Sequence, residues 1–177
     1  SYFDTIPKDK LMSQLREKIS DGKVLSLIQA YLDQEILDGM ERWTPEAGTP
    51  QGAVASPLMA NAYIDPLDHH MAKQGFEMTR YCDDFVVMCR SKREALLALD
   101  TIRAWTKQAG LMLHPTKTRV INIHDSDGFD FLGYRFQIDK KHSRGLIRQP
   151  RDKSLGKFRD KVRMLTKRNN GHSMATI

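Results

Sequence analysis

The sequence has no long hydrophobic run, and it has only two cysteines, Cys82 and Cys89, among its 177 residues. No apolar stretch approaches the roughly 20 residues that cross a membrane, and no signal peptide opens the sequence. We therefore expect a cytoplasmic protein with no membrane contact. Without secretion signals the two cysteines are more consistent with free thiols, although a disulfide between them stays open.

The sequence also lacks the residue patterns of several common sites. Its six histidines are scattered, and their spacing supports no zinc site. No Ser/His/Asp or Cys/His constellation indicates an activated nucleophile. Internal repeats and low-complexity tracts are absent. Hydrophobic residues make up an ordinary 40% of the chain, which is long enough for one domain with a substantial core.

Positive charge is concentrated near the end of the sequence. Residues 140–168 hold twelve Lys or Arg and two Asp, a net charge of +10, whereas the whole chain carries only +6. The remainder is therefore weakly acidic. Such a segment is by itself often a solvated helix or tail, but together with a carboxylate cluster it favours a surface that binds nucleic acid.

Apolar spacing and turn residues predict a mixture of helices and short strands. The predicted fold class is α+β, with an antiparallel sheet and helices packed on one face. Ser91 and Glu94 form a capping-box pattern, Gly110 suits the left-handed end of a helix, and Pro66 should kink or end its helix. We expect helices over 7–20, 23–38, 56–74, 92–109 and 154–168, a turn-rich loop over 38–56, hairpins over 78–89 and 137–149, and strands over 119–123 and 129–136.

The rest of the sequence is organised around adjacent carboxylates, Asp83 and Asp84, within an apolar stretch from Met78 to Cys89. We predict two short strands with the two Asp at the connecting turn. Neighbouring carboxylates repel, so their charge is best tolerated in water or around cations. On this stretch alone a solvated turn is the simpler interpretation. A site for divalent metal ions such as Mg²⁺, which prefer oxygen ligands, is the alternative.

Five short motifs follow one another along the chain. They are Tyr2-Phe3-Asp4-Thr5-Ile6, Gly48-Thr49-Pro50-Gln51-Gly52 with Ser56-Pro57-Leu58-Met59-Ala60-Asn61, Tyr81-Cys82-Asp83-Asp84, Gly110-Leu111 with Lys117-Thr118, and Phe131-Leu132-Gly133-Tyr134. In this order they resemble the motifs of reverse transcriptases, and their spelling resembles group II intron-encoded reverse transcriptase/maturases. Each motif alone is weak, whereas five in the right order are strong. The resemblance covers nearly the whole chain.

The resemblance implies a polymerase palm with a two-metal Mg²⁺ site for nucleotidyl transfer. Asp83 and Asp84 match two of the family's three metal-binding Asp residues, and Lys117 matches a lysine that stabilises or protonates the leaving pyrophosphate. By the family pattern the third Asp would lie three residues before Ser1, so we expect it to be missing from this chain. Asp4 matches a structural Asp and is not expected to replace it.

The resemblance also implies contacts with the nucleotide and the template. Phe3 matches the bulky residue that excludes the nucleotide 2′-hydroxyl. The backbone at Ser1 and Tyr2 would lie near the incoming triphosphate. Gln51 and Gly52 would lie beside the template and the nascent base pair.

Primer contacts are implied further along the chain. Phe131, Leu132 and Gly133 match the primer grip. Two departures from the family pattern, Cys82 where Ala is usual and Ala53 where Gly is frequent, should be tolerated. The basic side chains expected at the nucleic-acid backbone are Arg148, Arg151, Lys153 and Lys157.

The resemblance implies an RNA-directed DNA polymerase that extends a DNA primer on an RNA template with dNTP and Mg²⁺, and that binds intron RNA. Residues 1–149 would be the palm, with the upstream fingers and first catalytic motif truncated, and residues 150–177 would begin the helical thumb or maturase region. We expect this stretch alone to be inactive or nearly so. Two alternatives stay open: an RNA-binding maturase role without polymerisation, and a CRISPR-associated or retron-type reverse transcriptase.

Overall fold

The computed structural model describes residues 5–34, 36–38, 41–43, 48, 54–139 and 145–167. The chain divides into two compact units, residues 1–120 and 121–177, and each is considered by itself. Helices together with antiparallel strands confirm the predicted α+β class. Within the described ranges, no helix is both long enough and apolar enough to span a membrane.

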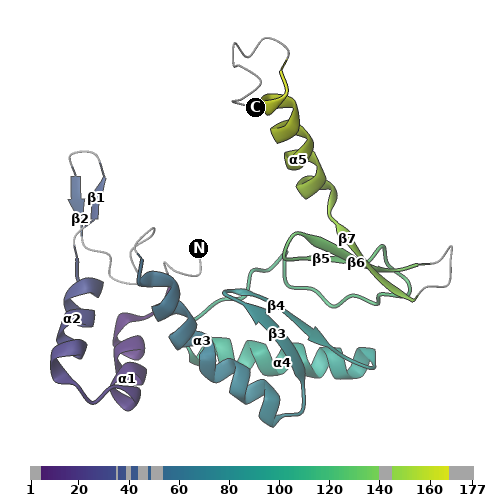
Figure 1. The fold of residues 1–177 in the computed structure, drawn as a ribbon. Helices are drawn as coiled ribbons and strands as arrows, with labels where there is room; N and C mark the ends of the chain where they lie inside the picture. Colours follow the sequence, from purple (N-terminus) through teal and green to yellow (C-terminus); the bar gives the residue numbers. More distant parts are fainter. Residues whose placement is uncertain are drawn as a thin grey trace. The chain divides into compact units, whose positions relative to one another are not determined.

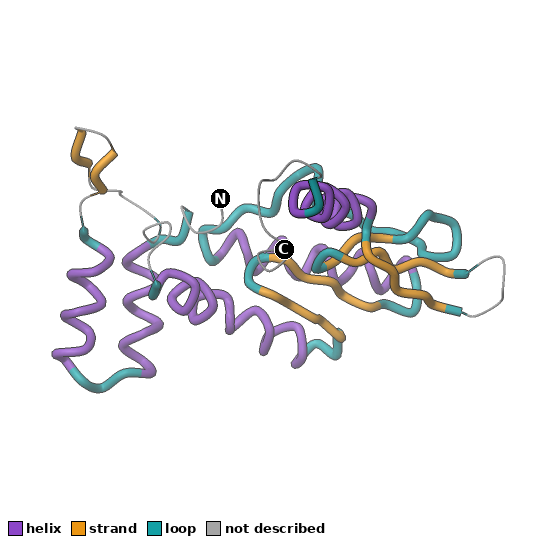
Figure 2. Tube along the Cα trace, turned by 45° about the horizontal axis from the view of Figure 1, so that its top comes forward, coloured by secondary structure: helices purple, strands orange, loops and turns teal. Residues whose placement is uncertain are grey.

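The strands form three small antiparallel sheets (Figures 1 and 2). The first two sheets are hairpins in the first unit, and the third is a three-stranded sheet in the second unit. The pairings are β1 (Ile36–Asp38) with β2 (Glu41–Trp43), β3 (Glu77–Tyr81) with β4 (Asp84–Met88), and β5 (Phe129–Phe131) with β6 (Tyr134–Ile138) and β7 (Leu146–Pro150).

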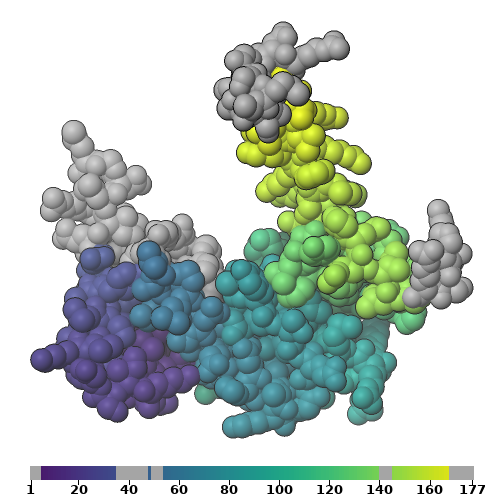
Figure 3. Space-filling view, in the orientation of Figure 1, coloured from purple at the N-terminus to yellow at the C-terminus, as the bar shows by residue number. Residues whose placement is uncertain are grey.

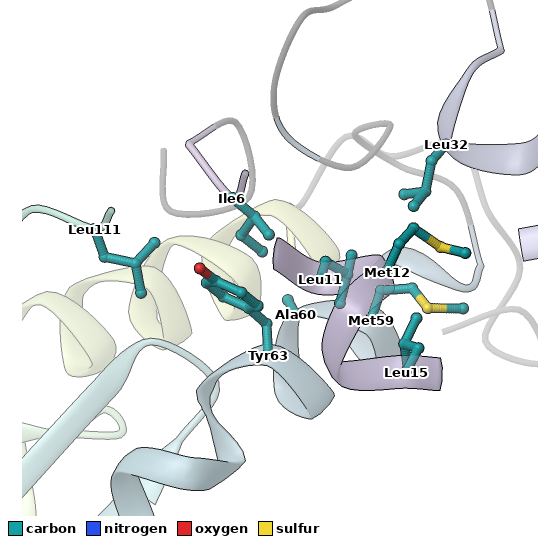
Figure 4. Close-up of a cluster of buried hydrophobic side chains, with 9 residues drawn as sticks. All are labelled: Ile6, Leu11, Met12, Leu15, Leu32, Met59, Ala60, Tyr63 and Leu111. Atoms are coloured by element: carbon teal, nitrogen blue, oxygen red, sulfur yellow. The ribbon is translucent and has the colours of Figure 1, made fainter. Parts of the chain in front are cut away.

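Helices α1 (Lys8–Lys18), α2 (Gly22–Leu32) and α3 (Ser56–Lys73) enclose the first hydrophobic cluster (Figure 4). Helices α1 and α2 lie side by side. The Asp21 carboxylate begins α2 by accepting hydrogen bonds from the backbone N–H groups of Lys23 (2.7 Å) and Val24 (3.3 Å). The buried members of the cluster are Ile6, Leu11, Met12, Leu15, Leu32, Met59, Ala60, Tyr63 and Leu111.

A second cluster joins α3 and α4 (Lys92–Gln108) to the β3–β4 hairpin. The inner side chains Met78, Phe85 and Val87 pack against its buried members. Both helices therefore cover one face of this hairpin, as predicted (Figure 1). The buried members are Ile64, Leu67, Met71, Phe76, Ala98 and Ile102.

Both predicted ends of α4 are confirmed. The Ser91 hydroxyl accepts a hydrogen bond from the backbone N–H of Glu94 at 3.2 Å. The Glu94 carboxylate accepts from the backbone N–H of Arg90 at 2.7 Å, one residue before the donor of an ideal capping box. Gly110 follows the helix with φ 75°, in the left-handed region that glycine tolerates.

The second unit consists of the β5–β6–β7 sheet and α5 (Asp152–Leu165). Phe129 and Phe136 are opposite each other in register, and their rings stack with centroids 5.3 Å apart. Gly128 allows this sheet to close, because a Cβ at this position would lie 2.0 Å from the carbonyl oxygen of Phe136. The predicted hairpin over 137–149 is present as β6 paired with β7, and its connection at 140–144 lies outside the described residues.

Several sequence-based expectations were wrong. No strand forms over 119–123, where the Asn122 side chain instead accepts a hydrogen bond from the backbone N–H of His124 at 3.2 Å and donates one to Asp125. Such local side-chain bonds offer the backbone an alternative to strand pairing. Helix α2 ends at Leu32, well before residue 38, and β1 and β2 occupy part of the expected loop. Helix α3 continues past Pro66 to Lys73, so of the two effects expected of this proline only the end of the helix is excluded.

Tyr63 connects α3 to the end of α4. Its ring is buried in the cluster (Figure 4). Its hydroxyl donates a hydrogen bond to the backbone carbonyl of Ala109. Burial, with a smaller effect from the negative charge of Asp9, raises the pKa of Tyr63 from 10.0 to about 12. Because the folded pKa lies above the unfolded value, this contribution to stability is complete below pH 10 and is lost as the pH rises towards 12.

We predict that Tyr63→Phe lowers the free energy of unfolding at neutral pH by about 1–3 kcal/mol, because the Ala109 carbonyl loses its donor. The variant should also lose stability less steeply than the wild type between pH 10 and 12. Urea unfolding followed by circular dichroism across this range measures both effects. Ile64→Val is the control, since it truncates a buried side chain with no titratable group and should keep the wild-type pH slope. Equal slopes for Tyr63→Phe and the wild type would contradict the prediction.

Candidate functional site

The predicted hairpin around Asp83 and Asp84 is present, but only Asp83 lies in its two-residue turn, because Asp84 is the first residue of β4. Tyr81 lies opposite Asp84 in the register of β3 and β4, which leaves Cys82 and Asp83 as the two central residues of the turn. Cys82 has φ 55°, whereas Asp83 is not among the residues with positive φ. Positive φ at the first central position alone is the pattern of a type II′ turn, where glycine is preferred. Cys82 therefore has an unfavourable backbone conformation at the tip of the hairpin.

The two faces of the hairpin differ in character. Directly opposed residues share a face, so Met78 and Val87 point towards α3 and α4 together with Arg80 and Phe85. The Tyr81–Asp84 pair belongs to the other face, and the Tyr81 side chain is 62% exposed. Apolar packing against the helices therefore leaves Asp84 on the face directed away from them.

Both carboxylates are exposed, and neither forms a hydrogen bond or ion pair with another described residue. Their oxygen atoms suit a hard divalent cation, which prefers such ligands. The described ranges contain no cluster of three or more His, Cys, Asp and Glu side chains suited to holding a metal ion. Asp83 and Asp84 could therefore supply part of a coordination shell, and the remaining ligands would come from water, substrate or other parts of the protein.

Sequence reasoning missed an ion-pair network directly behind this turn. Arg80 Nε donates to both carboxylate oxygens of Asp68 (2.8 and 3.1 Å), and Arg80 Nη2 donates to the second of them at 2.5 Å. Arg80 Nη1 donates to Asn61 Oδ1 at 2.9 Å and to the backbone carbonyl of Cys82 at 2.8 Å. A charged residue at an inward-facing strand position is the signal that could have indicated such partners.

Lys117 lies in an exposed turn over residues 115–117, next to a hydrogen bond from Thr118 N to the carbonyl of His114 at 3.0 Å. Within the described part of the chain its side chain has no hydrogen bond or ion pair. The contacts of the structure therefore do not join Lys117 to either Asp83 or Asp84.

The predicted nucleotide and template contacts at Ser1, Tyr2, Phe3, Gln51 and Gly52 lie outside the described residues. The neighbouring backbone is nevertheless informative. The N–H of Gly48 donates to the carbonyl of Ile6 at 2.8 Å, and Gly48 is buried. The structure thus joins Gly48, the first residue of the Gly-Thr-Pro-Gln-Gly motif, to Ile6, the last residue of the Tyr-Phe-Asp-Thr-Ile motif.

The predicted primer-grip residues form the turn between β5 and β6. Phe131 lies opposite Tyr134, and the two central residues, Leu132 (φ 49°) and Gly133 (φ 84°), give the pattern of a type I′ turn. The Gly133 carbonyl accepts hydrogen bonds from the backbone N–H of Arg151 (3.0 Å) and from the hydroxyl of Ser154 (3.1 Å). This turn is therefore fixed to the beginning of α5.

Several basic residues of the second unit lie on the elements next to this turn, β7 and α5. The Arg148 guanidinium lies 5.1 Å from the centroid of the Tyr134 ring, a cation–π contact. Arg151 is partly buried, whereas Lys153 and Lys157 are exposed on α5. None of the described side chains on α5 is buried, and Figure 3 shows them projecting along the helix, in yellow. The structure thus joins the predicted primer-grip turn to the start of the helix that carries Lys153 and Lys157.

Comparisons with known proteins show which family this chain is similar to. The model of the family described as reverse transcriptase (RNA-dependent DNA polymerase) matches residues 1–136. Protein YkfC of Escherichia coli (strain K12) is 26% identical over 178 residues, which cover 81% of this chain and 46% of that protein.

Two relatives are more similar over a shorter stretch. The uncharacterized 91 kDa protein in cob intron of Schizosaccharomyces pombe is 41% identical over 66 residues, covering 37% of this chain and 8% of that protein. The group II intron-encoded protein LtrA of Lactococcus lactis subsp. cremoris is 38% identical over 66 residues, covering 37% of this chain and 11% of that protein.

The chain therefore spans less than half the length of these relatives. The family match nevertheless covers most of the chain and includes the hairpin that carries both exposed carboxylates. The chain belongs to the reverse transcriptase (RNA-dependent DNA polymerase) family.

Proposed function

We propose that the protein containing this chain is an RNA-directed DNA polymerase of the group II intron type. The observation that carries the proposal is the exposed Asp83–Asp84 pair, whose carboxylates have no partner among the described residues, in a chain of the reverse transcriptase family. The likeness to an intron-encoded protein of Lactococcus lactis supports the group II assignment. Residues 1–149 would form the palm, and residues 150–177 would begin the thumb or maturase region.

The reaction would join a deoxynucleotide to the 3′ end of a DNA primer on an RNA template. Reverse transcriptases use Mg²⁺, and a bound pair of these ions would neutralise the triphosphate and the leaving pyrophosphate. Asp83 and Asp84 would hold the metal ions, together with an Asp that precedes Ser1 in the family pattern. Lys117 would stabilise or protonate the leaving group, from the exposed turn in which the structure places it.

Other residues would position the substrates. Phe3 would exclude a 2′-hydroxyl on the nucleotide, beside the backbone at Ser1 and Tyr2. Gln51 and Gly52 would contact the template near the new base pair. The turn at 131–133 would hold the primer, and its two hydrogen bonds from the beginning of α5 would keep it in a fixed position relative to the basic residues there.

We predict that Asp83→Asn with Asp84→Asn, in the full-length protein with its flanking sequence, abolishes primer extension. Loss of the metal ligands should remove several kcal/mol of transition-state stabilisation, a rate loss of about three orders of magnitude or more. Primer extension on an RNA template with labelled dNTP measures this. Asp100→Asn, which removes an exposed carboxylate from α4, is the control and should keep wild-type activity. Wild-type rates from the double variant would exclude the proposed site.

The conformation of Cys82 leads to a second prediction. Cys82→Ala should keep polymerase activity within about twofold, because a small side chain tolerates the same backbone. Cys82→Val should lower it at least tenfold, because a β-branched residue at φ 55° adds about 1–3 kcal/mol of strain at the turn. Rates of single-nucleotide addition by each variant provide the measurement. Cys89→Val makes the same change at a residue without positive φ, and a loss as large as that of Cys82→Val would refute the prediction.

A second role, binding of intron RNA as a maturase, is favoured by the basic character of the second unit. The α5 residues Lys153 and Lys157 are exposed, and Arg148 and Arg151 lie close to them along the chain. These cations would contact phosphates, and phosphate contacts release counterions on binding. RNA affinity that persists without Asp83 and Asp84 would separate this role from polymerisation.

We expect Lys153→Gln with Lys157→Gln to weaken RNA binding by the full-length protein. The slope of log affinity against log salt concentration should become shallower by about 0.7–0.9 for each lysine removed. Filter binding of intron RNA at several salt concentrations gives this slope. The matched control is Lys92→Gln with Lys107→Gln, which removes two exposed lysines from α4. An equal change of slope in both double variants would count against a specific role for α5.

A further inference from the structure

Arg80 is a cation that the fold largely shields from water. Its side chain is only 11% exposed, and it lies opposite Phe85 on the face of the hairpin that packs towards α3. Burying a charge is costly unless the charge is paired and its N–H groups are satisfied. The position of Arg80 therefore depends on the acceptors that surround it.

Those acceptors come from two places in the fold. Asp68 and Asn61 both belong to α3, two helical turns apart, so they lie on the same side of the helix. The Asp68 carboxylate accepts hydrogen bonds from Arg80 Nε and Nη2, and the Asn61 side chain accepts one from Nη1. The Cys82 carbonyl, at the turn, also accepts from Nη1, at 2.8 Å. The guanidinium thus connects α3 directly to the turn between β3 and β4.

The Cys82 carbonyl belongs to the central peptide of this turn, which joins Cys82 to Asp83. Turning that peptide over would convert a type II′ turn into type I′, in which the second central residue also has positive φ. Asp tolerates that conformation well, so Asp83 would not by itself prevent the change. In type I′ geometry the Cys82 carbonyl would point away from Arg80 and lose its hydrogen bond. The backbone dihedrals of Asp83 would also change, so its side chain would point in another direction.

We propose that Arg80, held by Asp68 and Asn61, is a positioning residue that fixes the central peptide of the Cys82–Asp83 turn. Its action rests on the proposed polymerase function, because the orientation that it fixes is that of the carboxylate pair. The guanidinium itself faces α3, where it pairs with Asp68 and Asn61. It acts through the backbone of the turn.

Lysine cannot reproduce this arrangement. The planar Arg80 guanidinium donates from Nε and Nη2 to the Asp68 carboxylate. Its Nη1 donates to the Asn61 side-chain oxygen and to the Cys82 carbonyl. A lysine ammonium keeps the charge but offers one donor atom, so it can satisfy the carboxylate or the carbonyl but not this geometry. Arg80→Lys therefore separates the effect of charge from the effect of position.

The experiment compares Arg80→Lys, Arg80→Met and Asn61→Ala in the full-length protein. Asn61→Ala removes one acceptor and leaves the ion pair with Asp68, so it keeps the test possible if an Arg80 variant fails to fold. Lys18→Gln is the matched control, because it removes another cation that pairs with α3, through Asp65, and the described hydrogen bonds of Lys18 do not include one to the turn. Each variant is measured for kcat, for KM of dNTP and of primer–template, and for the Mg²⁺ concentration that gives half-maximal rate.

A second measurement does not depend on activity. Hydrogen exchange, followed by mass spectrometry, reports how often the segment 78–88 opens in each variant. We expect exchange in this segment to become about tenfold faster in Arg80→Lys and Arg80→Met, because the charged hydrogen bond to the turn is lost. The control Lys18→Gln should exchange at the wild-type rate in the same segment.

The kinetic result should be a fall in kcat of about 10- to 100-fold in the Arg80 variants, the loss expected from misplaced catalytic groups. The Mg²⁺ requirement should rise severalfold, while KM for primer–template stays within about twofold of the wild type. A role in stability alone would lower the amount of folded protein without moving the Mg²⁺ requirement, and that outcome would overturn the proposal. Wild-type exchange and wild-type kcat in Arg80→Met would overturn it as well.

The two proposals can fail separately. If the wild-type protein does not extend primers under any condition, the polymerase assignment is wrong. The exchange measurement then still decides whether Arg80 fixes the turn: faster exchange over 78–88 supports this, and unchanged exchange refutes it.

Discussion

A guanidinium shielded from water must find its hydrogen-bond acceptors inside the protein, and this requirement shapes the first unit around Arg80. The acceptors are the Asp68 carboxylate and the Asn61 amide on α3, and the Cys82 carbonyl at the turn. One side chain thereby fixes the hairpin to the helix and sets the direction of the turn peptide. The carboxylates that follow this peptide are exposed.

Stability and orientation come from different interactions in this hairpin. Burying an apolar side chain such as Phe85 or Val87 against α3 and α4 contributes about 1.5–3 kcal/mol when burial is complete. A buried ion pair, by contrast, often breaks even against an apolar replacement, because the desolvation of both charges offsets their attraction. The Arg80–Asp68 pair is therefore weak evidence for stability. Apolar packing cannot give the Cys82 carbonyl a preferred direction, whereas a hydrogen bond from the Arg80 guanidinium can.

The sequence was most informative where structure depends on neighbouring residues. The capping interaction between Ser91 and Glu94 and the left-handed Gly110 are local, and both are present. The strand expected over 119–123 failed because β-propensity needs a partner strand, and Asn122 instead formed a local turn. The Arg80 network joins residues 12 and 19 positions apart, so the strand pattern could indicate that Arg80 needs partners but not which residues they are. Asp83 and Asp84 were singled out by the apolar stretch around them and then by motif order, and a solvated turn was one expected setting. The face of the hairpin on which Asp84 lies became visible only with the packing of the inner face.

The β3–β4 turn of the first unit and the β5–β6 turn of the second unit accommodate residues with positive φ in different ways. The β5–β6 turn places a glycine at one of its two left-handed positions, Gly133. The β3–β4 turn has no glycine, although Cys82 is left-handed at a cost of about 1–2 kcal/mol. A hydrogen bond to a charged group contributes about 1.5–3 kcal/mol, so the bond from Arg80 to the Cys82 carbonyl is large enough to offset that cost. Because this left-handed position holds a cysteine and not the preferred glycine, the turn is supported from outside, by the hydrogen bond that Arg80 donates to the Cys82 carbonyl.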